Sequence, residues 1–139
     1  MILLDTNVVA EPMKPRANSK VITWLDQQVA ETLYLTATSL SELLVGVALL
    51  PKGKRRDGLA LALTDLSRQL FGDRILPFDS EAAVVYASLV SRARAKGYAV
   101  SVADAQIGAI ASVHGLTVAT RDDAPFSAMG IPVTNPWEQ

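Results

Sequence analysis

The chain has 139 residues, a formal net charge of −1, 50% hydrophobic residues, 19% charged residues and no cysteine. This composition excludes an intrinsically disordered chain, which would be poor in hydrophobic residues and rich in charge. It also excludes disulfides and thiolate metal sites, because both require cysteine. The length is typical of one domain with its own core, so we predict a single domain over residues 1–139.

The location of the protein is indicated by what its sequence lacks. No apolar run approaches the ~20 residues that a bilayer-spanning helix needs. The opening residues 1–5 reach an acid without a basic region, which is not the pattern of a secretory signal. With the lack of cysteine, these features predict a cytoplasmic protein that does not associate with membranes. Because the net charge is slightly negative, binding to nucleic acid would depend on a local basic patch or on bound cations.

Short apolar runs alternate along the chain with amphipathic segments of helical period. The expected strands are residues 2–4, 32–36, 74–77, 116–120 and 132–134, the first without any polar alternation, as in a buried parallel strand. The expected helices are residues 18–30, 40–50, 55–71, 80–96 and 101–114. This alternation predicts an α/β fold of three layers (α/β/α), with a central, mainly parallel sheet of four or five strands.

Four acids stand where such a sheet would bind a ligand. Asp5 directly follows the first strand, and Asp122 lies just past the fourth. Glu42 and Asp104 lie in the first turns of predicted helices. In open parallel sheets, helices that follow strands start at the carboxyl edge, and ligands bind there. We therefore expect the four acids, although distant in sequence, to meet at one place.

Clustered carboxylates repel one another unless a cation neutralises them. Mg²⁺ suits such a cluster, because it prefers oxygen ligands and combines a few carboxylates with waters and substrate phosphates. A metal held in this way polarises a phosphodiester and generates hydroxide. The pattern thus predicts a hydrolase of phosphodiester bonds that uses Mg²⁺ or Mn²⁺, with Asp5, Glu42, Asp104 and Asp122 as metal ligands and catalytic residues.

Helix capping is the alternative explanation for two of these acids. Glu42 follows Ser39, and Asp104 follows Ser101, at the spacing of a capping box, in which the acid returns to the N–H of the capping residue. If all the acids only capped helices and turns, the protein would be a catalytically silent binding module. Asp5 is the hardest to explain in this way, because an acid at the end of an apolar strand is costly unless it is solvated or paired.

A second alternative is an acid-cluster phosphatase or a phosphate-accepting domain on a similar sheet. A phosphatase of the haloacid dehalogenase type has a second aspartate two residues after the first, whereas Asn7 stands there. A phosphate-accepting receiver has adjacent acids after an early strand, whereas Asp122 and Asp123 come late in the chain.

Five segments, in order and spanning nearly the whole chain, carry a family pattern. They are MILLDTNV at residues 1–8, SLSELLVG at 39–46, ADAQIGA at 103–109, ATRD at 119–122 and NPW at 135–137. Together they resemble the motifs of PIN-domain nucleases, in the VapC and FitB branch of toxins. The resemblance implies a single PIN domain over residues 1–139 that acts as the endoribonuclease toxin of a type II toxin–antitoxin pair.

The resemblance also implies roles for individual residues and partners. Asp5, Glu42, Asp104 and Asp122 would form the Mg²⁺ or Mn²⁺ site, and Thr6 and Thr120 would assist through their hydroxyls. Asp123 is the alternative to Asp122 as the fourth acid. The implied partners are an RNA substrate, a second copy of the chain, and a small VapB- or FitA-like antitoxin that covers the site. Operator DNA would be reached only through that antitoxin.

Three further features bear on binding. Arg121 adjoins the predicted site and is a better candidate for contacting a substrate phosphate than the cluster of cations described next. The cations at residues 52 and 54–56 gather where a helix begins, which is electrostatically unfavourable. They are either a solvated loop or a contact for RNA phosphates. The helix at 40–50 is apolar on most sides, which indicates an interface.

Overall fold

Five parallel strands form the centre of the protein, which we describe from a computed structural model covering residues 1–139. The strands are β1 (Ile2–Leu4), β2 (Leu33–Thr36), β3 (Ile75–Leu76), β4 (Thr117–Ala119) and β5 (Val133–Thr134), in the spatial order β3-β2-β1-β4-β5. Every pair of neighbours is parallel, so the predicted parallel sheet is confirmed. The chain extends the sheet from β1 through β2 to β3 and then returns to the other side of β1 with β4 and β5, so the order reverses beside β1.

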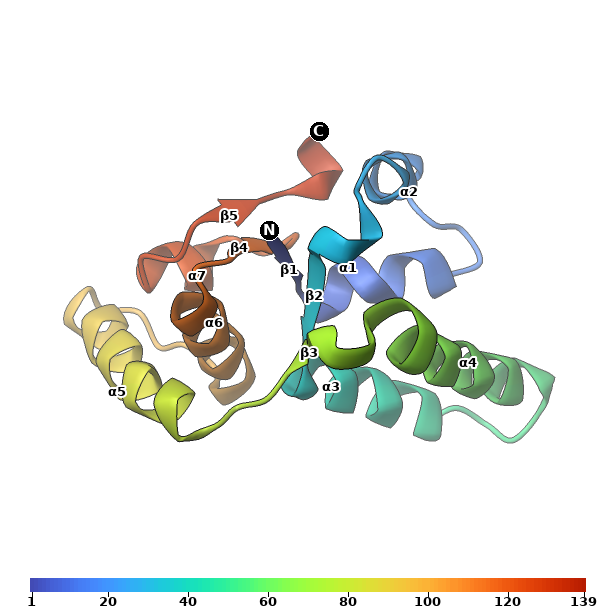
Figure 1. Cartoon of the computed structure of the whole chain (residues 1–139), viewed down its shortest axis with the longest axis horizontal. Helices are drawn as coiled ribbons and strands as arrows, with labels where there is room; N and C mark the ends of the chain where they lie inside the picture. The colour runs from blue at the N-terminus through green and yellow to red at the C-terminus, as the bar shows by residue number, and fades with distance from the viewer.

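Helices cover both faces of this sheet (Figure 1). They are α1 (Thr6–Ala10), α2 (Ser19–Asp26), α3 (Ala37–Ala48), α4 (Lys54–Asp65), α5 (Ser80–Ala95), α6 (Val102–His114) and α7 (Ala124–Ala128). The shorter turns are η1 (Glu11–Met13), η2 (Ala30–Thr32), η3 (Leu66–Phe71), η4 (Gly72–Arg74) and η5 (Pro136–Glu138). None of the helices is long and apolar enough to cross a membrane.

Two apolar clusters separate the three layers. Because side chains alternate along a strand, Leu3 and Val118 pack on the face covered by α5, α6 and α7. Leu4 and Ala119 pack on the opposite face, against α1, α2, α3 and α4. Both faces of β1 and β4 are therefore buried, which explains why these strands are continuous apolar runs.

The boundaries of several helices differ from the predicted ones. α2 ends at Asp26 instead of residue 30, and the Gln28 side chain donates to the Trp24 carbonyl, 3.0 Å away, in its last turn. The helix predicted over 55–71 is α-helical only to Asp65 and continues as the wider π-helical turn η3. α7 was not predicted, because its five residues are too few to show a period.

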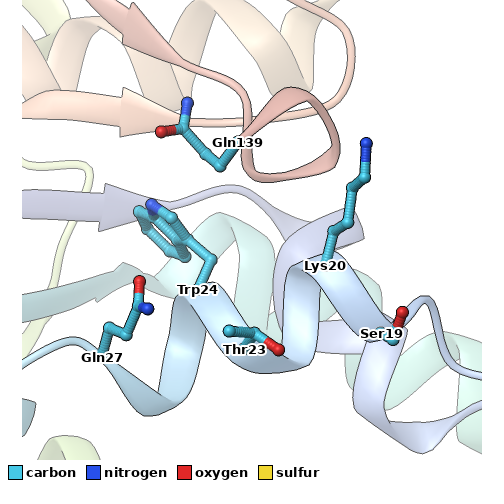
Figure 2. Close-up of a pocket in the computed structure, with 6 residues that line it drawn as sticks. All are labelled: Ser19, Lys20, Thr23, Trp24, Gln27 and Gln139. Atoms are coloured by element: carbon cyan, nitrogen blue, oxygen red, sulfur yellow. The ribbon is translucent and has the colours of Figure 1, made fainter.

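The C-terminal turn η5 packs against α2. Trp137 is half-buried against the same apolar cluster as Trp24 of α2. Figure 2 shows Gln139 opposite Trp24 across an open cavity of about 230 Å³. The residues that precede η5 are held in this way beside the end of β4.

Gly115 and Gly58 provide a matched test of the helix assignments. Gly115 ends α6 with φ +65°, so alanine there should cost roughly 1–2 kcal/mol of folding free energy. Gly58 lies inside α4 with open space around its Cβ position, so alanine should instead stabilise the protein by about 0.5–1 kcal/mol. Urea unfolding of both variants measures the two shifts, and equal signs would contradict the assignments.

Candidate functional site

Asp5 occupies the centre of the site at the carboxyl end of β1. It is the N-cap of α1, and its Oδ1 accepts a hydrogen bond from the Thr6 N–H at 2.8 Å. Its Oδ2 accepts a hydrogen bond from the Thr120 hydroxyl at 2.8 Å. Asp5 is only 6% exposed and Thr120 is fully buried, so the carboxylate is fixed on both oxygens.

Glu42 reaches the same place from α3. The Thr6 hydroxyl, at the start of α1, donates to Glu42 Oε1 at 2.6 Å. The capping-box explanation of Glu42 is wrong, because the N-cap of α3 is Thr36, whose hydroxyl oxygen accepts from the Ser39 N–H at 2.9 Å. Ser39 lies inside the helix, fully buried, and its hydroxyl has no hydrogen-bond partner.

Asp104 stands in the first turn of α6. Ser101 is the N-cap, as the sequence predicted, and its hydroxyl oxygen accepts from the Asp104 N–H at 3.1 Å. α6 is tied to α3 by a hydrogen bond from the Thr38 hydroxyl to Gln106 Oε1 at 2.9 Å. Sequence reasoning missed this link, since the two residues are 68 positions apart and neither belongs to a local pattern.

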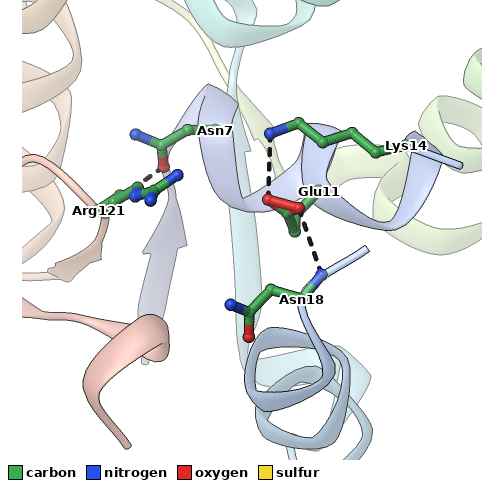
Figure 3. Close-up of polar contacts among 5 residues, drawn as sticks. All are labelled: Asn7, Glu11, Lys14, Asn18 and Arg121. Carbon is green, nitrogen blue, oxygen red and sulfur yellow. Dashed lines mark hydrogen bonds and ion pairs between the residues drawn. The ribbon is translucent and has the colours of Figure 1, made fainter. Parts of the chain in front are cut away.

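Side chains from three parts of the chain hold the loop after β4, which carries Asp122. Thr120 Oγ1 accepts from the Asp122 N–H at 3.1 Å, so one hydroxyl joins Asp5 to this loop. The Arg121 N–H donates to Asn7 Oδ1 at 3.4 Å (Figure 3), and the Asn135 amide donates to the Arg121 carbonyl at 3.4 Å. Sequence reasoning missed both of these contacts, which the side-chain amides of Asn7 and Asn135 make with the loop.

The Arg121 guanidinium lies over the ring of Trp137, 5.3 Å from its centroid. This cation–π contact connects the terminal NPW motif to the site. Of the two adjacent acids, Asp122 interacts electrostatically with Asp104. Asp123 stands at the start of α7, where its side chain makes no capping bond.

Electrostatics link all four acids. Burial raises the pKa of Asp5 to about 6, against the hydrogen bonds from Thr120 and Thr6, and the charges of Asp104 and Glu42 add to the rise. Burial also raises the pKa of Asp104, and the charges of Asp122 and Glu42 contribute. Asp104 therefore interacts electrostatically with the other three acids, whereas Asp122 interacts with Asp104 alone.

The chemistry of this cluster fits a hard divalent cation. All of its donors are carboxylate or hydroxyl oxygens, the ligands that Mg²⁺ and Mn²⁺ prefer. No three acidic or histidine side chains stand close enough here to ligate one ion directly. Mg²⁺ commonly uses one or two carboxylates and keeps several waters, so Asp5 with Asp104 or Glu42 would be sufficient.

Comparison with known proteins gives a consistent picture. The profile of the PIN domain matches residues 2–131. The chain is 49% identical over 138 residues to the plasmid stability protein StbB of Pseudomonas syringae pv. tomato. It is 47% identical over 137 residues to the toxin FitB of Neisseria gonorrhoeae and 44% identical over 138 residues to the VapC ribonuclease Y4jK of Sinorhizobium fredii. Each alignment covers 99% of both chains.

Solved structures agree with these similarities. The crystal structure of FitAcB from Neisseria gonorrhoeae contains a chain that superposes with a TM-score of 0.96 at 46% identity, covering 100% of both chains. A chain in the structure of FitAB bound to a DNA fragment superposes with a TM-score of 0.95 at 44% identity, covering 99% of this chain and 96% of that one.

The raised pKa of Asp5 predicts a pH dependence of stability in the absence of metal. The folded protein favours the protonated carboxyl, so the stabilisation is complete below the ordinary pKa of 3.8 and is lost as pH rises through about 6. The loss should be on the order of 3 kcal/mol. Asp5→Asn should remove this dependence and should stabilise the metal-free protein at pH 7.

Urea unfolding in the presence of a chelator measures the free energy of unfolding of wild type and of Asp5→Asn. The series of pH values starts at about 4, the ordinary carboxyl pKa, and goes upward. Asp73→Asn is the control, because Asp73 is exposed in η4, away from the site. Parallel curves for wild type and Asp5→Asn would contradict the assignment of a strained, buried carboxylate.

Proposed function

This chain belongs to the PIN domain family, in its branch of FitB- and VapC-like proteins, and on that premise we propose that it is the toxin of a type II toxin–antitoxin pair. Its activity is Mg²⁺- or Mn²⁺-dependent endoribonuclease cleavage. The observation that carries the proposal is the hydrogen-bonded network at the carboxyl edge of the sheet, in which Thr6 joins Asp5 to Glu42 and Thr120 joins Asp5 to the loop of Asp122. Burial and neighbouring charges raise the pKa of Asp5 and that of Asp104. A relative named as a VapC ribonuclease supports RNA as the substrate.

Each side chain of the site has its own role in the proposed reaction. When bound, the metal polarises the scissile phosphodiester and acidifies a water. Asp5 would hold the metal, and its carboxylate is kept in one orientation by Thr120 and by the Thr6 N–H. The Thr6 hydroxyl orients Glu42 in the same way, so two threonines position two carboxylates before substrate arrives. Arg121 is exposed beside the cluster and binds a substrate phosphate.

A small antitoxin of the VapB or FitA type inhibits the enzyme by covering the acid cluster. Exposed carboxylates attract arginine, which binds them with charge-assisted hydrogen bonds, so an antitoxin arginine would replace the cation. Operator DNA is reached only through this partner. The similarity to chains in FitAcB and in FitAB bound to DNA supports both partnerships.

A homodimer is the third element of the proposal. Leu44, Val45 and Leu49 of α3 are 49%, 56% and 80% exposed, an unusual apolar surface for a monomer. Leu49→Glu should shift the protein from dimer to monomer in light scattering, because it places a charge in the interface. Val29→Glu is the control, since Val29 is exposed in the loop after α2. A wild-type protein that is already monomeric would contradict the dimer.

The catalytic assignment predicts which acids are essential. Asp5→Asn, Glu42→Gln and Asp104→Asn should each reduce Mn²⁺-dependent RNA cleavage by at least about 100-fold, because each removes ligand charge. Asp122→Asn should cost more activity than Asp123→Asn, since only Asp122 couples to Asp104. Cleavage of labelled RNA, with a chelator as the blank and Asp73→Asn as the control, gives these rates.

Calorimetric titration with Mn²⁺ separates this function from a silent binding module. A specific Mn²⁺ site that is lost in Asp5→Asn is expected. Full cleavage by Asp104→Asn, or no specific Mn²⁺ binding by the wild type, would overturn the proposal.

A further inference from the structure

A groove of about 270 Å³ leads away from the acid cluster. At the cluster it is lined by Thr6 and Glu42, which are hydrogen-bonded to each other. Its floor is one face of α3 from Glu42 to Val47, continued by Leu50 just past the end of the helix, and Arg55 of α4 lines it as well. From Glu42 to Val47 this face spans somewhat more than one helical turn, roughly 8 Å. The groove is therefore continuous with the proposed metal site and longer than that site.

The cations at the start of α4 form no ion pair within the protein. The only ion pair in the protein joins Lys14 to Glu11, so Arg55 has no carboxylate partner. α4 begins with three consecutive cations, Lys54–Arg56, at the end of the helix dipole that repels them, and its N-cap Gly53 supplies no side-chain bond. Folding alone does not account for positive charge here, whereas an anionic ligand would.

Lys14, which also lines the groove, is held in place by a buried acid. Figure 3 shows Glu11 between Lys14 and Asn18, with one carboxylate oxygen 3.2 Å from Lys14 Nζ and the other accepting from the Asn18 N–H at 3.5 Å. Glu11 is only 3% exposed, whereas the Lys14 side chain is 55% exposed. The loop between α1 and α2 therefore presents an ordered cation to the groove.

We infer that this groove binds the single-stranded RNA that flanks the cleaved bond, with its phosphates at Arg55 and Lys14 and its bases on the apolar floor. The inference rests on the proposed function and extends it to a substrate path. A chain with net charge −1 needs local cations to hold a polyanion beside four acids. The remaining lining, including Met13, Val47 and Leu59, is aliphatic and can cover base faces through apolar contact.

The groove is open at Gly46, which has no side chain to fill it. A Cβ built on Gly46 would meet no atom within 4 Å, although the residue lies in the middle of α3 and lines the groove. Leucine at this position should favour the helix and at the same time fill the groove. A loss of binding in Gly46→Leu could not be attributed to a weaker fold, provided that urea unfolding shows unchanged or higher stability.

The test measures binding of a fluorescein-labelled single-stranded oligouridylate by anisotropy, in an Asp104→Asn background that does not cleave it. Arg55→Gln should weaken binding roughly 10-fold at low salt. It should also reduce the slope of log affinity against log salt by about 0.7, the value for one phosphate contact on a single strand. Arg94→Gln, an exposed cation on α5 in the opposite layer, should change neither quantity.

Cleavage assays then separate this inference from the proposed function. In the otherwise wild-type enzyme, Arg55→Gln and Gly46→Leu should raise KM and leave kcat nearly unchanged, because neither residue touches the reacting atoms. If the wild type does not cleave RNA but binds it through Arg55, the ribonuclease proposal fails and the groove stands. Equal affinity and salt slope for Arg55→Gln and Arg94→Gln would overturn the groove. The groove inference would also be overturned if Gly46→Leu bound RNA normally but no longer bound an antitoxin peptide.

Discussion

The carboxylate of Asp5, buried at the end of the central strand, fixes most of the geometry of the site. Its own N–H donates to the Ala119 carbonyl at 2.9 Å, which joins β1 to β4. One carboxylate oxygen starts α1 through the Thr6 N–H, and the other receives the Thr120 hydroxyl, from which the loop to Asp122 departs. A single side chain thus ends a strand, begins a helix and orients a catalytic loop. Its burial, needed for these three contacts, is also what raises its pKa.

The acid cluster lowers the stability of the fold, because its carboxylates repel one another. The neighbouring side chains orient these acids but do not neutralise them. Threonine hydroxyls fix Asp5 and Glu42, but no lysine or arginine pairs with either, since the protein has one ion pair elsewhere. A cation from the protein would relieve the repulsion and close the site. Proteins tend to retain such local conflicts where function requires them. The negative charge is thus left unpaired within the protein, as the divalent metal or the partner arginine of the proposed function would require.

Sequence pattern predicted the sheet, and the placement of Asp5 and Asp122 after its strands, because both depend on short-range rules. The shared role of the four acids in one metal site stays a prediction. A strand without polar alternation must be buried on both faces, and the carboxyl ends of parallel strands share one edge. What the sequence could not give depends on contacts between distant residues. Ser39 has the spacing of a cap, yet Thr36 caps α3, because β2 ends there and fixes where the helix starts. The bond between Thr38 and Gln106 joins two helices and has no local signature.

Charge in this protein is separated within one surface instead of being spread evenly. Acids occupy the carboxyl edge of the sheet, and cations occupy the start of α4, where Arg55 lines the same groove as Glu42. In the proposed function, a neutralised metal site would attract one phosphate but would not hold the rest of a strand, since the net charge of the protein repels it. Cations outside the cluster would hold that strand, and none of them forms an ion pair with the four acids. Arg55 lines the same groove as Glu42 and leaves its carboxylate unpaired.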